Sequence, residues 1–256
     1  MGTSANCPAG TLGPVEVEEY ARIAAVEDDH WWYRNTRALA SDLLGPWLAD
    51  GPRILDAGCG PGGNGASFAE HGSVFGVDVS PDALAFVRAR RPQTVPTQAG
   101  IEALPFVDGA FDIALAVTVL YAVPDDARAL TELARVVRRG GAVLLVEPAF
   151  ESLGRAHDAT VHGQRRYRRS TLIELVGRAG LVVERATYAY SFLAPPAAAL
   201  GVFDRVHNRR YTPAGSDVDK RTLDRVFEPL ASAERRWLAR HDVAWGTSVV
   251  VLARRA

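Results

Sequence analysis

The chain has 256 residues, of which 48% are hydrophobic and 23% are charged, and its formal net charge is −1. These values are typical of a globular protein and give no whole-chain electrostatic basis for binding DNA or RNA. The two cysteines, Cys7 and Cys59, lie in a small-residue tail and in a glycine loop. We therefore expect no structural disulfide and predict a reducing, cytoplasmic location.

The N-terminal region is polar at first and then helical in pattern. Residues 1–14 are predicted to be a disordered tail with no signal peptide, and residues 15–50 a helical segment that ends before Gly51-Pro52. No apolar run reaches the roughly 18 residues needed to cross a bilayer. Inside the helical segment, "EDDHWWYRNTRAL" (27–39) mixes acids, a histidine, aromatic residues and arginines, which is unlike a simple core helix.

Short apolar strands then alternate with amphipathic helices. The predicted strands are "RILDAGCG", "SVFGVDVS", "FDIALAVTVL", "AVLLVEPAF", "LVVERATY" and "TSVVVLARR". A helix is expected to begin at Ser80-Pro81-Asp82; others are "DARALTELARVVRRGG", closed by its glycines, and "RSTLIELVGRAG", capped by Ser/Thr. This alternation predicts an α/β fold with a doubly wound, mostly parallel sheet and helices on both faces.

The chain is predicted to form a single domain. Residues 51–190 form its core, residues 191–240 a helical insertion before the last strand, and residues 241–256 that strand. The insertion is apolar and aromatic near its start. It suits either the wall of an acceptor pocket or a helix packed on the sheet edge or on a second subunit, so both a monomer and a homodimer are compatible with it.

The stretch "LDAGCGPGG" joins the first strand to the next helix. Gly58, Gly60 and Gly63 match the dinucleotide fingerprint, and Asp78 lies twenty residues after Gly58, where a ribose-binding acid belongs. This match alone is weak. Asp56, two residues before the first glycine, suits a ligand with a cationic group better than a pyrophosphate. A nucleotide-dependent dehydrogenase and a protein that binds a sulfonium or ammonium compound are both open at this point.

Four stretches in order, "ILDAGCGPG", "VFGVDVS", "EALPFVDGAFDIALAV" and "LARVVRRGGAVLLVEP", make residues 53–148 resemble the class I S-adenosylmethionine-dependent methyltransferases. The resemblance implies a seven-stranded sheet, a helical lid before the first strand, S-adenosylmethionine as cofactor and S-adenosylhomocysteine as product. It further implies the positions that contact the cofactor, namely Asp56, Gly58, Cys59, Gly60, Asp78, Val79, Ile101 and Thr118.

The sequence departs from the family pattern at two positions. Gly100 stands where relatives often carry an acid for the adenine amino group, so either Glu102 substitutes or that contact is missing. In "TVLYAV" (118–123), Tyr121 and Ala122 replace the acid and histidine that are usual there. No general base is therefore carried over from this segment.

The family has no fixed catalytic residue, because methyl transfer from a sulfonium depends mainly on alignment and desolvation. The candidates for a base are His157, His162 and Tyr167, although the surrounding arginine run is equally compatible with a solvated helix end. The acceptor is expected to contact Trp32, Tyr121, Glu147, Tyr190 and Phe192. The histidines lack the spacing of a helical zinc motif, so no metal is expected.

The segment "DDHWWYRNTRAL" then becomes the predicted lid. Tyr33 and one of Arg34 or Arg37 are expected to bind the cofactor's carboxylate, for which arginine offers a fork of donors, and Asp28 and Asp29 to begin or cap the lid helix. The leading hypothesis is a methyltransferase of secondary metabolism that acts on a small, moderately apolar metabolite. The alternatives are an RNA or protein methyltransferase, a dehydrogenase and a catalytically silent binding protein.

Overall fold

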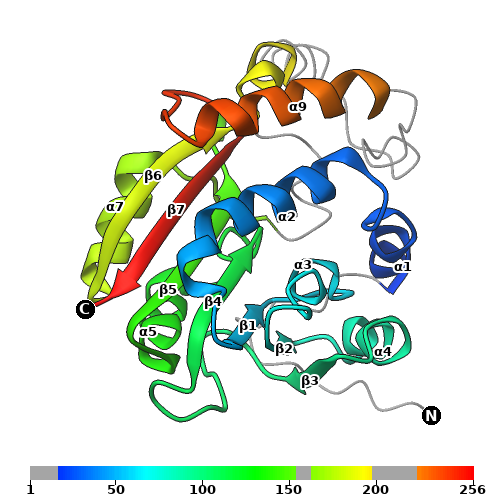
Figure 1. Ribbon diagram of the computed structural model, residues 1–256, viewed down its shortest axis with the longest axis vertical. Helices are drawn as coiled ribbons and strands as arrows, with labels where there is room; N and C mark the ends of the chain where they lie inside the picture. Colours follow the sequence, from blue (N-terminus) through cyan, green and yellow to red (C-terminus); the bar gives the residue numbers. More distant parts are fainter. Residues whose placement is uncertain (1–16, 154–162, 198–223) are drawn as a thin grey trace, which may run out of the picture.

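A computed structural model describes residues 17–153, 163–197 and 224–256 and contains one seven-stranded sheet (Figure 1). The strand order is β3-β2-β1-β4-β5-β7-β6, in which β1 to β5 are parallel and β7 runs antiparallel to both β5 and β6. The strands are β1 (Arg53–Ala57), β2 (Ser73–Asp78), β3 (Thr94–Gln98), β4 (Phe111–Val117), β5 (Val137–Pro148), β6 (Leu181–Ala189) and β7 (Ser248–Arg255).

Helices cover both faces of the sheet. The α-helices are α1 (Val17–Val26), α2 (Trp31–Leu44), α3 (Gly63–Ala66), α4 (Pro81–Arg90), α5 (Asp126–Val136), α7 (Arg169–Arg178) and α9 (Asp224–Leu238), and the short 3-10 helices are η1 (Gly45–Trp47), η2 (Glu151–Leu153) and η3 (Ser191–Leu193). In Figure 1, α2 and α9 lie side by side, while α1 stands next to α4 at the β3 end. This arrangement confirms the predicted α/β architecture.

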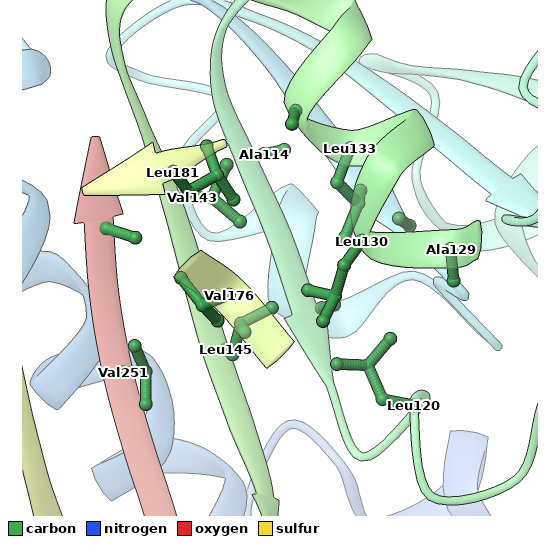
Figure 2. Packing of buried hydrophobic residues seen from close by; sticks show 14 of the residues in the cluster. Ala114, Leu120, Ala129, Leu130, Leu133, Val143, Leu145, Val176, Leu181 and Val251 are labelled. Carbon is green, nitrogen blue, oxygen red and sulfur yellow. The ribbon is translucent and has the colours of Figure 1, made fainter. Parts of the chain in front are cut away.

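The central strands are apolar on both faces because each face is covered by helices. In β4, Ala114 and Ala116 pack into a cluster with α5 and α7, which Figure 2 shows from close by. The alternate residues Ile113, Leu115 and Val117 pack on the opposite side with α2 and α9. The sheet is therefore a rigid platform whose loops at the carboxyl ends of the parallel strands are available for a site.

The strand β3 has no counterpart among the strands predicted from the sequence. Its letters, TVPTQ, are polar and include Pro96, which argues against a central strand. Proline is tolerated here because β3 is an edge strand that pairs only with β2, where Pro96 stands opposite Gly76. The strand depends on its neighbour, so local pattern could not reveal it.

Two helix boundaries differ from the prediction. The helix expected to run to its glycines ends at Val136, and Val137 already pairs with Phe111 as part of β5. Helix α7 begins after Arg168, which has no side-chain cap, instead of at a Ser/Thr cap. The predicted Ser80 cap of α4 is confirmed, because its hydroxyl accepts a hydrogen bond from the Ala83 N–H at 3.3 Å.

The predicted domain divisions stay predictions. The lid segment contains α1, α2 and η1, and the described parts of the 191–240 insertion contain η3 and α9. The 1–14 tail lies outside the described residues. Across the described ranges, no helix is both long and apolar enough to cross a membrane.

Candidate functional site

The glycine loop follows β1 at the point where the strand order reverses, since β2 and β4 flank β1 on opposite sides. In doubly wound sheets this switch point is where ligands bind. Gly58 has a φ of +73°, and a Cβ there would lie 2.5 Å from the Val119 side chain. Only glycine satisfies both the backbone conformation and this close approach. The predicted loop residues are therefore brought to the sheet's carboxyl edge.

Asp56 is the penultimate residue of β1 and is buried next to the loop. Its carboxylate accepts a hydrogen bond from the Gly65 N–H at 2.7 Å. Burial raises the pKa of Asp56 to about 7, against the lowering effect of that N–H. In this structure Asp56 holds the shape of the glycine loop; its predicted contact with the cofactor stays a prediction.

Asp78 ends the neighbouring strand β2 with both carboxylate oxygens ordered by backbone donors. The Gly60 N–H and the Ser80 N–H each donate to it at 2.9 Å. Burial raises the pKa of Asp78, and these donors together with the Tyr20 hydroxyl lower it. Asp78 thus links β2 directly to the glycine loop, in the place where a ribose-binding acid was predicted.

Tyr20 of α1 is a site residue that the sequence analysis missed. Its hydroxyl is hydrogen-bonded to Asp78 and Ser80, and its Cε1 lies 4.0 Å from where a Cβ on Gly60 would stand. Burial, followed by the Asp78 charge, raises its pKa. An aromatic residue in an amphipathic helix predicts core packing, so the sequence carried no signal for this contact.

The residues predicted at the adenine lie together where β2 and β3 end. Val79 is 56% exposed, and a Cβ on Gly100 would lie 3.7 Å from Val79 and 3.9 Å from a carboxylate oxygen of Glu102. The other Glu102 oxygen accepts from the Asp125 N–H at 3.0 Å. Ile101 is buried. The structure therefore clusters these side chains and leaves Val79 as an open apolar platform.

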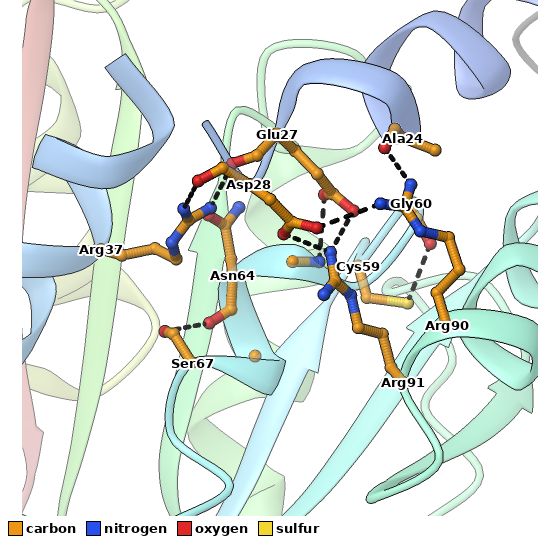
Figure 3. Close-up of polar contacts among 12 residues, drawn as sticks. Ala24, Glu27, Asp28, Arg37, Cys59, Gly60, Asn64, Ser67, Arg90 and Arg91 are labelled. Carbon is orange, nitrogen blue, oxygen red and sulfur yellow. Dashed lines mark hydrogen bonds and ion pairs between the residues drawn. The ribbon is translucent and has the colours of Figure 1, made fainter. Parts of the chain in front are cut away.

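The corner between α1 and α2 is fastened to the glycine loop and to α4, as Figure 3 shows. Glu27 is buried and accepts from the Gly63 N–H at 3.1 Å and from Arg91 at 2.8 Å. Asp28 accepts from Arg91 at 2.6 Å and from Arg90 at 3.0 Å. We call Glu27, Asp28, Arg90 and Arg91 the corner latch. None of the contacts among these four residues was predicted, because they join residues more than sixty positions apart.

The predicted lid residues meet protein partners in this structure. Arg37 donates to the carbonyls of Glu27 at 2.7 Å and Asp28 at 3.2 Å, and Arg34 forms an ion pair with Glu228. Burial raises the pKa of Tyr33. The expectation that Asp28 or Asp29 caps the lid helix is wrong: the cap is His30, whose Nδ1 accepts from the Trp32 N–H at 3.3 Å. Capping by an imidazole is rare, so the neighbouring aspartates were the natural prediction.

Three of the predicted acceptor residues belong to an aromatic cluster between α2, η3 and α9. The Trp32 and Tyr190 rings lie 6.2 Å apart, and Tyr190 shares a buried 2.6 Å hydrogen bond with Thr36. Phe192 is half-buried and lies 6.0 Å from the Trp31 ring. The cluster is largely internal packing, with Trp32 and Phe192 at its partly exposed side.

The remaining acceptor-side predictions concern the loop after β4 and the segment before α7. Thr118, with a φ of +55°, begins the loop, and half-buried Tyr121 lies within it. Buried Glu147 and Tyr167 lie beneath it, and burial raises the pKa of the Tyr167 hydroxyl, which does not favour a base. His157 and His162 lie outside the described residues. Among the described residues no cluster of three or more His, Cys, Asp or Glu side chains is arranged to hold a metal ion.

Two of the buried acids, Asp56 and Glu147, make stability depend on pH. Burial raises the pKa of Asp56 to about 7 and that of Glu147 to about 8, so each retains its proton longer in the folded chain than in the unfolded chain. Their contribution to stability is complete below about pH 4 and is lost as the pH rises to about 8. We expect the free energy of unfolding from urea titrations to fall by more than about 1 kcal/mol between pH 5 and 8.5. The Glu147→Gln variant should show a shallower fall, and an equally steep one would contradict the assignment.

Comparison with known proteins gives matches over most of the chain. A methyltransferase domain model matches residues 55–145. A malonyl-[acyl-carrier protein] O-methyltransferase of Pseudescherichia vulneris is 30% identical over 241 residues, which is 89% of this chain and 93% of the relative.

Two solved structures share the fold. The S-adenosylmethionine-dependent methyltransferase from Mesorhizobium loti has a TM-score of 0.56 and 21% identity and covers 90% of this chain and 100% of its own. The [4+2]-cyclase SpnF has a TM-score of 0.60 and 19% identity, covering 96% of this chain and 97% of its own. Likeness to a cyclase indicates that this fold alone does not fix the reaction.

Proposed function

The chain belongs to the class I S-adenosylmethionine-dependent methyltransferases, and from this premise we propose that it methylates a small, moderately apolar metabolite. The acceptor atom is an oxygen, nitrogen or carbon nucleophile, and S-adenosylmethionine is the donor. The observation that carries the proposal is the pairing of the glycine loop with Asp78 at the switch point of the sheet. Asp78 can accept hydrogen bonds from two ribose hydroxyls, and the neighbouring glycines let the ligand approach the backbone closely.

The residues present fit such a cofactor. Asp78 is a buried acceptor at the end of β2, and exposed Val79 next to it offers an apolar face for adenine. Gly58 and Gly60 have no side chains to obstruct a ligand at these two positions of the loop. Tyr33, Arg34 and Arg37 are proposed for the carboxylate end, which requires an arginine to exchange its present partner for the ligand. When bound, S-adenosylmethionine supplies an activated methyl group on a sulfonium sulfur.

The protein's part in the reaction is to bind, align and exclude water. The glycine loop and Asp78 position the donor, and the lid helix α2 with its aromatic residues closes over the acceptor side. Trp32, Tyr121 and Phe192 are proposed to contact the acceptor because all three are partly exposed and aromatic. A nucleophile that is already deprotonated needs no base, so none is assigned to a described residue.

A second candidate acceptor is a carboxylate carried on an acyl carrier protein. The similarity to a malonyl-[acyl-carrier protein] O-methyltransferase over most of both chains favours it. A carboxylate is already deprotonated at neutral pH, so it is a nucleophile that needs no general base. Separate assays with a free carboxylic acid and with the same acid loaded on a carrier protein distinguish the two candidates.

The proposal is tested by calorimetric titration of the purified chain with S-adenosylhomocysteine and, separately, with NAD. We expect saturable binding of S-adenosylhomocysteine and no binding of NAD, because an acid at Asp56, next to the glycine loop, disfavours the negative charge of a pyrophosphate. Binding of NAD without binding of S-adenosylhomocysteine would overturn the proposal.

A further inference from the structure

The loop between β4 and α5, residues 118–125, lies next to the glycine loop. Val119 fills the space beside Gly58, where a Cβ would meet its side chain at 2.5 Å. The loop begins at Thr118 in the left-handed region, with a φ of +55°, which a β-branched residue rarely adopts. The Thr118 N–H donates to the Val146 carbonyl at 2.7 Å. Such an unfavourable backbone conformation persists only where surrounding contacts stabilise it.

Glu147, at the end of β5, accepts hydrogen bonds from three consecutive backbone N–H groups of this loop. One carboxylate oxygen accepts from Val119 at 3.1 Å and from Leu120 at 2.9 Å, and the other accepts from Tyr121 at 3.2 Å. The residue is fully buried. Because the side chain is 0% exposed and both oxygens are engaged with the backbone, Glu147 presents no surface to a substrate in this arrangement.

The segment before α7 holds the same loop through its carbonyl groups. The Gln164 N–H donates to the Tyr121 carbonyl at 2.9 Å. The single proton of the Tyr167 hydroxyl is shared between the Leu120 carbonyl, at 3.1 Å, and the Asp126 carboxylate of α5, at 2.7 Å. Arg165 pairs with the same carboxylate at 3.1 Å. The loop is therefore fixed on its donor side by β5 and on its acceptor side by residues 164–167.

We propose that Glu147 is a positioning residue that sets the backbone of residues 119–121, with Tyr167 holding the same turn from the opposite side. The loop is thereby a preset wall between the cofactor site and the acceptor, and its half-buried Tyr121 is the side chain that this wall presents. The role of this loop as a wall between cofactor and acceptor rests on the proposed function. It replaces two sequence-based roles, Glu147 as a substrate contact and Tyr167 as a base.

Ionisation of Glu147 predicts a pH dependence of the loop that a side chain acting only by packing would not produce. Burial raises its pKa to about 8, the three loop N–H groups lower it, and Asp126 raises it further. The other ionisable groups of this network are Tyr167 and Arg165. Because burial disfavours the ionised carboxylate, a rise in pH through the pKa of Glu147 favours opening of the loop, and its N–H groups become less protected.

The test is amide hydrogen exchange by NMR on the full chain, comparing wild type, Glu147→Gln and Glu147→Ala. Alanine removes both acceptor oxygens and with them all three hydrogen bonds, and we expect exchange at residues 119–121 to rise at least about tenfold. Glutamine keeps an oxygen for Val119 and Leu120 but turns an amide N–H₂ toward Tyr121, so only Tyr121 should exchange faster. Glu174→Gln, which changes an exposed carboxylate of α7 that pairs with Arg178, is the matched control and should leave residues 119–121 unchanged.

Two outcomes overturn the proposal. One is unchanged exchange at residues 119–121 in both Glu147 variants; the other is a rise that is equal in the loop and in the β1–β2 core, which indicates general destabilisation. In wild type, exchange corrected for its intrinsic rate should accelerate between pH 6 and 9, and this step should be absent in Glu147→Gln. S-adenosylhomocysteine titration of wild type judges the proposed function separately, because the exchange pattern does not depend on it.

Discussion

Asp78→Ala is expected to lower the affinity for S-adenosylhomocysteine at least about 100-fold. A hydrogen bond to a charged group contributes roughly 1.5–3 kcal/mol, and the proposal gives Asp78 two ribose hydroxyls, so about 3–6 kcal/mol of binding free energy is at stake. The carboxylate also receives the Gly60 N–H and the Ser80 N–H. Removing it loosens the glycine loop as well, which adds to the loss. Isothermal titration calorimetry measures the effect directly.

Two variants make this result specific. Asp78→Asn keeps the side-chain size and one acceptor oxygen, so we expect an intermediate loss of about tenfold. Asp82→Ala removes a partly exposed acid four residues later, in the first turn of α4, and should leave the affinity within about twofold. If Asp78→Ala binds as tightly as wild type while remaining folded, the ribose is not held by this acid.

The parts of the site that lie on one strand-to-loop segment could be predicted from the sequence. Asp56, Gly58 and Gly60 follow one another at the end of β1, and Asp78 ends the next strand, so parallel pairing of β1 with β2 brings them together without further information. The buried strands were equally clear, because apolar residues on both faces of β4 indicate a covered sheet.

The parts that depend on contacts between distant segments could not be predicted. Tyr20 reaches Asp78 from α1, and Glu27 meets Arg91 across 64 positions. An arginine pair at the end of α4 is indistinguishable in sequence from a solvated helix end. The same holds for β3, which exists as a strand only because the edge of β2 accepts it.

Residue types were more predictable than roles. Glu147 and Tyr167 were singled out as a substrate contact and a base because of their chemistry and their place after β5. Their hydrogen bonds instead run to the backbone of the loop after β4. A sequence shows that a carboxylate stands near a site, whereas only the fold shows whether backbone N–H groups have already occupied its oxygens.

Arg91→Ala is expected to have the second large effect, on both stability and cofactor affinity. Glu27 is 3% exposed, and losing its cation leaves a buried carboxylate that accepts a hydrogen bond from the Gly63 N–H but has lost its arginine partner. Breaking a mostly buried pair in this way costs roughly 2–3 kcal/mol of unfolding free energy. Urea denaturation measures this loss. Arg88→Ala, an exposed arginine on the same helix, is the matched control and should change stability by less than about 0.5 kcal/mol.

The affinity for S-adenosylhomocysteine should fall about tenfold in Arg91→Ala, because the corner latch holds α1 and α2 against the glycine loop and the Tyr20 hydroxyl against Asp78. The double variant Glu27→Gln/Arg91→Ala separates charge from shape. Glutamine still offers an oxygen to the Gly63 N–H but buries no charge, so part of the lost stability should return. If the double variant recovers stability but not affinity, the latch acts on the lid through Arg91 itself. If neither variant alters affinity, the α1–α2 corner is a packing element and the cofactor site is complete without it.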